Sequence, residues 1–253
     1  MNAFSLVQSP SKLLYLLVND NNLLYRRKIV NLYPATIVDN FYEDPDAVRA
    51  FALAQEYKHC HEIAGNKFVF PGARTKDLNA LDSKLYENIC RKFVSVFHNP
   101  EHDYMRWAIS TNFQSVTADY KSGAIHTDHN TILAAVLFLT PDAPLDAGTS
   151  LFRKNKTFDQ AKYQAAIEEN DAIYRAKYKV MKAEYHSMFD EVVRVNNVYN
   201  SLIIYSGDTF HAANSFFGST LQDARLTQVF FVNRIDARKH SSFPLNRTKA
   251  IKV

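Results

Sequence analysis

The second half of the chain consists of short β-compatible segments separated by turn residues, and this alternation limits the folds that the chain can adopt. Residues 134–139, Ala-Ala-Val-Leu-Phe-Leu, form a continuous apolar run that is typical of a buried strand. Ser206-Gly207-Asp208 marks one of the turns. Roughly seven or eight short strands spaced in this way indicate a sandwich or a small barrel. We therefore expect a mostly β fold with flanking helices.

The first part of the chain carries helix signals. Asp44 is placed as an N-cap, and Pro45 follows at the first helical position. Apolar residues at every fourth position predict a second helix over residues 80–97. We expect a single domain over residues 1–253, with N-terminal strands and supporting helices in residues 1–104 and the β core in residues 105–238.

A charged segment, residues 158–188, interrupts the predicted β core. Its tyrosines, among them Tyr163 and Tyr174, recur on one face of a helix predicted over residues 160–188. The interpretation that we favour is an amphipathic helix that packs on the core. The alternative is a lid, because insertions between strands often carry function, and Tyr163 or Tyr174 would then contact the substrate.

Charge and cysteine content exclude several classes of protein. The formal net charge of +4 is too small to predict nucleic-acid binding, so we expect no nucleic-acid partner. Two cysteines, Cys60 and Cys90, cannot build a disulfide scaffold or a cysteine-based zinc site. No run approaches the ~20 apolar residues of a membrane helix, and the N-terminal apolar patch is too short for a secretion signal. We expect a cytoplasmic protein without membrane contact, and the sequence leaves its oligomeric state open.

A His-x-Asp motif, His126-Thr127-Asp128, lies at the end of a strand-like segment. On a strand, residues i and i+2 point to the same face, so His126 and Asp128 can share one metal ion. His211 follows later in the chain, after the turn at Gly207. Two histidines and one carboxylate make a facial triad, which leaves positions open on a six-coordinate Fe(II). Taken singly, a surface pair and a core histidine are the simpler interpretation, but order and strand placement together favour an iron site.

Arg225 and Thr227 lie on one face of the last strand-like segment. A guanidinium fork beside a hydroxyl suits the terminal carboxylate of a small diacid. Tyr120, upstream of the His-x-Asp motif, can add a phenolic hydrogen bond. Arg234 lies further along the segment of Arg225, and the sequence leaves open which of the two arginines binds the diacid.

The order of these residues resembles the Fe(II)/2-oxoglutarate-dependent oxygenases. A tyrosine, His-x-Asp, a Gly-Thr turn at Gly148, a distal histidine and Arg-x-Thr follow one another, and this order is similar in particular to the prolyl-4-hydroxylase-like branch. The resemblance covers roughly the second half of the chain. It implies a double-stranded β-helix core, of the jelly-roll or cupin-like kind, with Fe(II) as cofactor and with 2-oxoglutarate and O2 as co-substrates.

The resemblance also implies residue roles and a reaction. It assigns iron to His126, Asp128 and His211, and 2-oxoglutarate to Arg225, Thr227 and Tyr120. The implied reaction is hydroxylation of an amino acid, a peptide or a small metabolite, with release of succinate and CO2. Because a halide needs a vacant ligand position, the carboxylate of Asp128 favours hydroxylation over halogenation.

Other interpretations remain for two sequence features and for the function. The run His59-Cys60-His61 looks like a metal cluster, but adjacent side chains diverge, so we expect no site there. Arg74, in a Pro-Gly loop, is either a solvated charge, which we favour, or a substrate contact. The alternative functions are a cupin-like protein with a different metal and a non-catalytic binding module. Iron-dependent formation of succinate would separate these functions.

Overall fold

The computed structural model describes residues 35–96, 105–128, 130–176 and 184–237, all of which lie in one compact unit, residues 33–243. The strands are β1 Thr36–Val38, β2 Lys58–His59, β3 Ala73–Arg74, β4 Met105–Val116, β5 Leu133–Phe138, β6 Thr149–Lys154, β7 Phe189–Val195, β8 Leu202–Ser206, β9 Phe210–Ala213 and β10 Arg225–Ala237. The α-helices are α2 Pro45–Leu53, α3 Leu78–Leu81, α4 Ser83–Ser95 and α5 Gln160–Arg175, and short 3-10 helices span Cys60–Glu62, Ala118–Tyr120 and Glu184–Met188. The single domain expected over residues 1–253 stays a prediction, because both chain ends lie outside the described residues.

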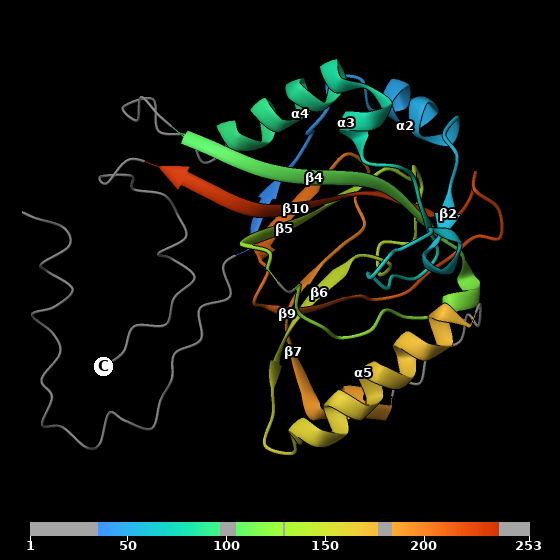
Figure 1. Ribbon diagram of the computed structural model, residues 1–253, viewed down its shortest axis with the longest axis vertical. Coiled ribbons are helices and arrows are strands. Elements are labelled where there is room, and N and C mark those ends of the chain that lie inside the picture. Colours follow the sequence, from blue (N-terminus) through green and yellow to red (C-terminus); the bar gives the residue numbers. More distant parts are fainter. Residues whose placement is uncertain (1–34, 97–104, 129, 177–183, 238–253) are drawn as a thin grey trace, which may run out of the picture. The chain divides into compact units, whose positions relative to one another are not determined.

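Two antiparallel sheets face each other. The larger sheet has the strand order β1-β8-β5-β10-β4-β3-β2, and the smaller sheet has the order β7-β6-β9 (Figure 1). An isolated bridge between His126 and His211 adds the segment before β5 to the free edge of the smaller sheet. The chain therefore passes repeatedly from one sheet to the other between β4 and β10. This is the order of a jelly roll, and it confirms the expected double-stranded β-helix.

Strand register decides which side chains face the space between the sheets. Thr227 on β10 pairs with Gln114 on β4 and with Phe138 on β5. Phe138 packs in an apolar cluster with Leu151 of the smaller sheet, so this row of the larger sheet faces inward. Because side chains alternate along a strand, Arg225 shares the inward face with Thr227.

Helices cover the outer face of the larger sheet, where α4 lies along β4 (Figure 1). Phe93 on α4 stacks on Phe230 of β10 at 5.3 Å between ring centroids and meets Trp107 of β4 edge-on at 6.0 Å. Asp44 caps α2 by accepting a hydrogen bond from the amide of Ala47, as the sequence predicts. These contacts make the N-terminal helices a support for the strand that carries Arg225.

The helix expected over residues 80–97 is two helices. Asp82 ends α3 and caps α4, because its carboxylate accepts a hydrogen bond from the amide of Leu85 at 2.9 Å. The apolar residues at every fourth position over residues 80–97 gave no sign that the helix is interrupted at Asp82. A local capping interaction therefore overrides the longer periodicity at Asp82.

The helix expected over residues 160–188 is shorter than predicted. α5 ends at Arg175, and a 3-10 helix follows at Glu184–Met188, while residues 177–183 lie outside the described part of the chain. Tyr163 packs in an apolar cluster with Tyr185, and Tyr174 packs in another with Tyr120. The described part of the insertion is thus an amphipathic helix that packs on the core.

Within the described ranges, no helix is long and apolar enough to cross a membrane.

Replacing Phe93 by alanine is expected to lower the free energy of unfolding by about 3–5 kcal/mol, because the ring is fully buried and its loss leaves a cavity. Phe68 is the matched control, since its side chain is 76% exposed and Phe68→Ala should cost no more than about 0.5 kcal/mol. Denaturant unfolding followed by circular dichroism measures both values. Equal losses in the two variants would contradict the packing of α4 on β10.

Candidate metal centre

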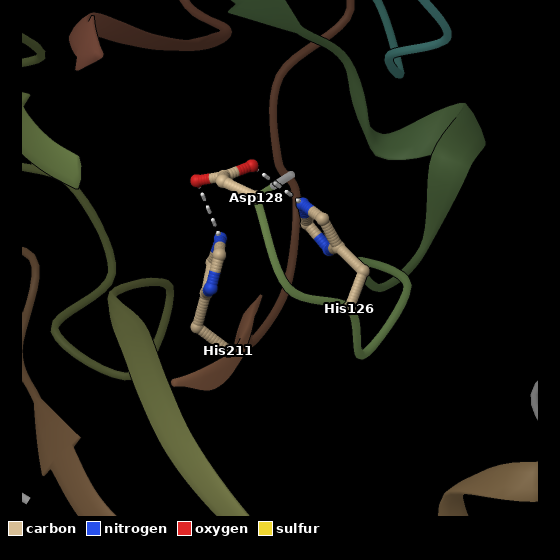
Figure 2. Close-up of side chains that lie close together, drawn as sticks. All are labelled: His126, Asp128 and His211. Atoms are coloured by element: carbon tan, nitrogen blue, oxygen red, sulfur yellow. Dashed lines mark ion pairs between the residues drawn. The ribbon is translucent and has the colours of Figure 1, made fainter. Parts of the chain in front are cut away.

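The two histidines lie directly opposite each other across two neighbouring segments. The amide of His126 donates to the carbonyl of His211 at 3.1 Å, and the amide of His211 donates to the carbonyl of His126 at 2.9 Å. Residues paired in this way project their side chains to the same face. The two imidazole centroids are 4.4 Å apart (Figure 2). Backbone pairing alone therefore brings residues from distant parts of the chain to one point.

Asp128 reaches the same point because it lies two residues after His126. Its amide donates to the carbonyl of Gly207 at 2.9 Å, which fixes the segment against the turn after β8. A Cβ at residue 207 would lie 2.0 Å from the carbonyl oxygen of Thr131, so only glycine permits this close approach. The Asp128 carboxylate lies between the rings, with Oδ1 3.6 Å from Nε2 of His126 and Oδ2 3.4 Å from Nε2 of His211 (Figure 2).

Backbone acceptors set the orientation of both rings. Nδ1 of His126 lies 2.8 Å from the carbonyl oxygen of Ala124, and Nδ1 of His211 lies 2.9 Å from that of Thr209. A carbonyl only accepts, so each Nδ1 carries a proton, and each Nε2 faces the carboxylate, where it can offer its lone pair to a metal once it is deprotonated. In the described parts of the chain, these three side chains form the one such group, and their ligand atoms lie within 4.8 Å of one another. This donor set fits Fe(II).

The protonation states agree with a metal site. Burial lowers the pKa of His211 to about 4, against the opposing charge of Asp128. Burial acts in the same sense on His126, but the hydrogen bond and charge of Asp128 outweigh it and raise the pKa of His126. Burial acts to raise the pKa of Asp128, yet the two histidines and Arg74 hold it below its ordinary value. A neutral imidazole and a carboxylate thus face the point where a metal would displace the remaining proton.

The centre is open on one side. The side chain of His126 is 44% exposed, against 15% for Asp128 and 8% for His211. The side of the centre at His126 is therefore the most accessible to other molecules. Asp171 on α5 lies near enough to interact with His126. Burial raises the pKa of Asp171, against the charges of Arg175 and His126.

Arg225 is buried at the inward face of β10. Its Nε donates to the carbonyl of Ala147 at 2.9 Å, and its Nη2 donates to the carbonyl of Gly148 at 3.3 Å and to Oγ1 of Thr149 at 3.4 Å. None of the described carboxylates forms an ion pair with it. Burial lowers the pKa of Arg225 to about 10, so the group is still a cation at neutral pH. A buried guanidinium held by neutral oxygens alone is able to bind an anion.

The other predicted 2-oxoglutarate residues lie around Arg225. Thr227 is fully buried on the same face, with Oγ1 3.5 Å from the carbonyl of Gln114. Tyr120 lies at the end of a 3-10 helix, and its ring packs against that of Phe216 with 6.4 Å between the centroids. Phe216 in turn lies 5.8 Å below the guanidinium of Arg225. Of the two arginines that the sequence left open, Arg225 is interior and Arg234 is exposed.

Sequence reasoning missed Tyr205. This residue lies one position before the end of β8, and its ring packs on His211 at 4.7 Å between centroids. Burial raises the pKa of Tyr205, and its phenol interacts with the charges of Asp128 and Arg225. It therefore connects the metal centre with the buried arginine. The apolar run before the turn at Gly207 predicted the strand, but nothing local distinguished this tyrosine from the other tyrosines of the chain.

The substrate residues proposed from the sequence are found in different surroundings. Arg74 is not in a solvated loop but on β3, where its guanidinium is largely enclosed. Tyr163 and Tyr174 pack into the two apolar clusters under α5.

The two histidines of the His59-Cys60-His61 run stack on each other. Their ring centroids are 5.4 Å apart, and Nδ1 of His59 lies 2.8 Å from the carbonyl oxygen of Gly72. Within the described residues, neither histidine belongs to a group of three potential metal ligands.

Fold and centre together define a double-stranded β-helix protein with a two-histidine, one-carboxylate group. The chain belongs to a family of unknown function (DUF6445), whose model matches residues 25–232. No curated protein has a sequence that matches this chain.

Solved structures with a similar fold include three from bacteria. HygX from Streptomyces hygroscopicus, with nickel and 2-oxoglutarate bound, is 10% identical at a TM-score of 0.47, covering 82% of this chain and 84% of HygX. A 2OG-Fe(II) oxygenase family oxidoreductase from Burkholderia pseudomallei is 10% identical at a TM-score of 0.44, covering 82% and 88%. A Pseudomonas putida prolyl-4-hydroxylase is 14% identical at a TM-score of 0.38, covering 80% and 93%. These proteins are of the class that the sequence resembles, and the function of this chain has to be argued from its own side chains.

Proposed function

We propose that this protein is an Fe(II)- and 2-oxoglutarate-dependent dioxygenase that hydroxylates an amino acid, a peptide or a small metabolite. The observation that carries the proposal is the convergence of His126, Asp128 and His211 at the inward face of the double-stranded β-helix. Two neutral nitrogens and one carboxylate favour iron over metals that require thiolates or all-oxygen sites. Three protein ligands leave room for a bidentate co-substrate and for oxygen.

In this proposal, the protein's own side chains hold the iron, and backbone carbonyls fix the proton of each imidazole on Nδ1, so that Nε2 is the nitrogen that binds the metal. The carbonyls of Ala124 and Thr209 keep each Nε2 directed at the metal, so binding requires no ring rotation. The bound iron would supply oxygen activation, coupled to oxidation of 2-oxoglutarate to succinate and CO2. Asp128 occupies the position that a halide would need, which supports hydroxylation over halogenation.

Arg225 is proposed to bind the distal carboxylate of 2-oxoglutarate. The Nε and Nη2 hydrogen bonds of its guanidinium fix the plane of the fork. Thr227, on the same face, offers a hydroxyl, and Tyr120 is proposed to assist from across Phe216. Because the surroundings are dry, the ion pair with a carboxylate would be much stronger than one in water.

The insertion helix α5 is proposed to border the substrate entrance. Asp171 interacts electrostatically with His126, the most exposed of the three ligand residues, and this supports a position of the middle of α5 near the open side of the centre. Tyr163 and Tyr174 lie on the same helix, and their packing holds the helix against the core. Substrate contact by the two tyrosines stays a proposal.

Formation of succinate from 2-oxoglutarate tests the proposed function. Purified protein supplied with Fe(II), ascorbate and air is expected to produce succinate slowly without any primary substrate. The reaction should stop without oxygen, and it should stop when Zn(II) replaces Fe(II), since zinc has no redox chemistry. Iron binding without succinate formation would favour a differently metallated cupin-like protein, and absence of both would favour a binding module.

A further inference from the structure

A second enclosed arginine lies near the centre and is not used by the proposed reaction. Arg74 pairs with Gln114 in register, and Gln114 pairs with Thr227, so Arg74 belongs to the inward row of the larger sheet. Gly72 precedes it with φ +68°, and a Cβ there would lie 2.1 Å from the carbonyl oxygen of Ser115. Only glycine allows this approach of the chain to β4. The short strand β3, which lies between β4 and β2, is therefore held so that Arg74 points inward.

Neighbouring groups hold the guanidinium of Arg74 in one orientation. It lies 4.3 Å above the ring of Phe70 and 5.3 Å from that of Phe231. Its Nη2 donates to Oε1 of Gln114 at 3.2 Å, and Nε2 of Gln114 donates to the carbonyl of Pro71 at 2.8 Å, which fixes the amide. Nε of Arg74 is buried and has no hydrogen-bond partner. One donor of a rigid fork is thus left for a further acceptor.

The positive charge of Arg74 interacts with residues of the metal centre, but no carboxylate of the centre forms an ion pair with it. Burial lowers the pKa of Arg74 to about 10, and its charge interacts with that of Asp128. None of the described carboxylates, Asp128 included, lies within ion-pair distance of Arg74. Its charge also acts on His126, the residue on the open side of the centre. The cation therefore lies on the inward face of the larger sheet and within electrostatic reach of the centre.

Charge balance indicates what that molecule carries. In the proposed enzyme, a divalent iron, Asp128, Arg225 and dianionic 2-oxoglutarate together are neutral, and Arg74 adds one uncompensated positive charge. Asp171 does not compensate it, because Asp171 interacts with Arg175 and His126. An unpaired charge in an enclosed position is costly, and a bound carboxylate removes this cost.

We propose that Arg74 binds the carboxylate of the primary substrate, and that this substrate is a small free carboxylic acid. The inference rests on the proposed function and narrows its substrate class. The free Nε and the Nη2 donor of Arg74 make the fork, while Phe70 and Phe231 flank it with apolar surface for the carbon skeleton. A small acid fits better than a protein side chain, since Nε itself has no solvent exposure.

The test uses protein labelled with 15N at arginine and loaded with Zn(II) as a diamagnetic substitute for iron. The Nε–H resonance of Arg74 is assigned by its loss in Arg74→Lys, and that of Arg225 by its loss in Arg225→Lys. The protein is titrated first with 2-oxoglutarate and then with free amino acids and simple monocarboxylic acids, each beside its primary amide. We expect 2-oxoglutarate to shift the Arg225 resonance, and at least one acid, but not its amide, to shift that of Arg74 with saturation.

The same acid should increase the rate of succinate formation by the iron-loaded protein. In Arg74→Gln its Michaelis constant should rise about 100-fold, with partial recovery in Arg74→Lys, because one partner of an enclosed ion pair is lost. Arg153→Gln is the matched control, since Arg153 is exposed and pairs only with Asp190 on the neighbouring strand, and it should leave this constant unchanged.

Three results would overturn the inference. They are a shift of Arg74 by 2-oxoglutarate itself, equal shifts by an acid and its amide, and no shift of Arg74 by any acid. Failure of the proposed function is a different result, in which neither iron nor 2-oxoglutarate binds. The titrations are read from the wild-type protein, and the two lysine variants serve only to assign the resonances, with a thermal melt of each to show that it folds.

Discussion

His211→Ala is expected to abolish stoichiometric iron binding. His211 supplies one of three ligand atoms from a buried position, and the remaining pair, His126 and Asp128, comes from a single segment. Loss of a partner that only orients a ligand already costs about 10–100-fold in metal affinity, and loss of the ligand itself should exceed this. Metal content after dialysis against Fe(II) under nitrogen measures the effect. His126→Ala should behave in the same way.

Two further variants make this result specific. His61→Ala removes a histidine that stacks on His59 away from the centre, and its iron content should equal that of the wild type. Asp128→Ala should end hydroxylation while weak metal binding by the two imidazoles persists. Wild-type iron content and succinate formation in all three ligand variants would show that the assignment of the centre is wrong.

Arg225→Ala is expected to weaken 2-oxoglutarate binding by about two to three orders of magnitude while iron still binds. Breaking a buried arginine–carboxylate pair costs about 3–5 kcal/mol, because the carboxylate is left without its counter-charge. Arg225→Lys should restore only part of the affinity, since an ammonium cannot reproduce the planar fork that donates to Ala147 and Gly148. Calorimetry with 2-oxoglutarate and the Zn(II)-loaded protein gives the dissociation constants.

Arg234→Ala is the matched control for this experiment. Arg234 lies on the same strand as Arg225, beyond a register shift, and its side chain is exposed. It should bind 2-oxoglutarate like the wild type. The reverse outcome, in which Arg234→Ala loses affinity and Arg225→Ala retains it, would transfer the role to Arg234. A thermal melt of each variant separates loss of binding from loss of folding.

Local rules were enough to predict part of the fold and the proximity of two of the proposed ligand residues. Asp44 caps its helix through its own side chain, and the i, i+2 geometry of His126 and Asp128 depends only on extended backbone. Strand order between the two sheets was not accessible from local pattern. It came from the resemblance, and the pairing of β4, β5, β8 and β10 confirms it.

The features that sequence reasoning missed depend on contacts between distant segments. β3 has only two residues, and it forms by pairing with β4, which is distant in the sequence. The residues next to Arg74 in the sequence therefore could not show whether its side chain is enclosed or is a solvated loop charge. Tyr205 became notable only when pairing placed His211 beside it.

In the proposed enzyme, the bridge between His126 and His211 would tie iron binding to the completion of folding. Their pairing joins segments that lie far apart in the chain, and closure of long loops comes at an entropic cost. A nascent or partly folded chain would offer no more than the local pair of His126 and Asp128, which would hold iron weakly. Iron would therefore bind folded molecules in preference to incompletely folded ones. This preference would shift the folding equilibrium toward the native state, and a cell poor in iron would hold the protein in a less stable form.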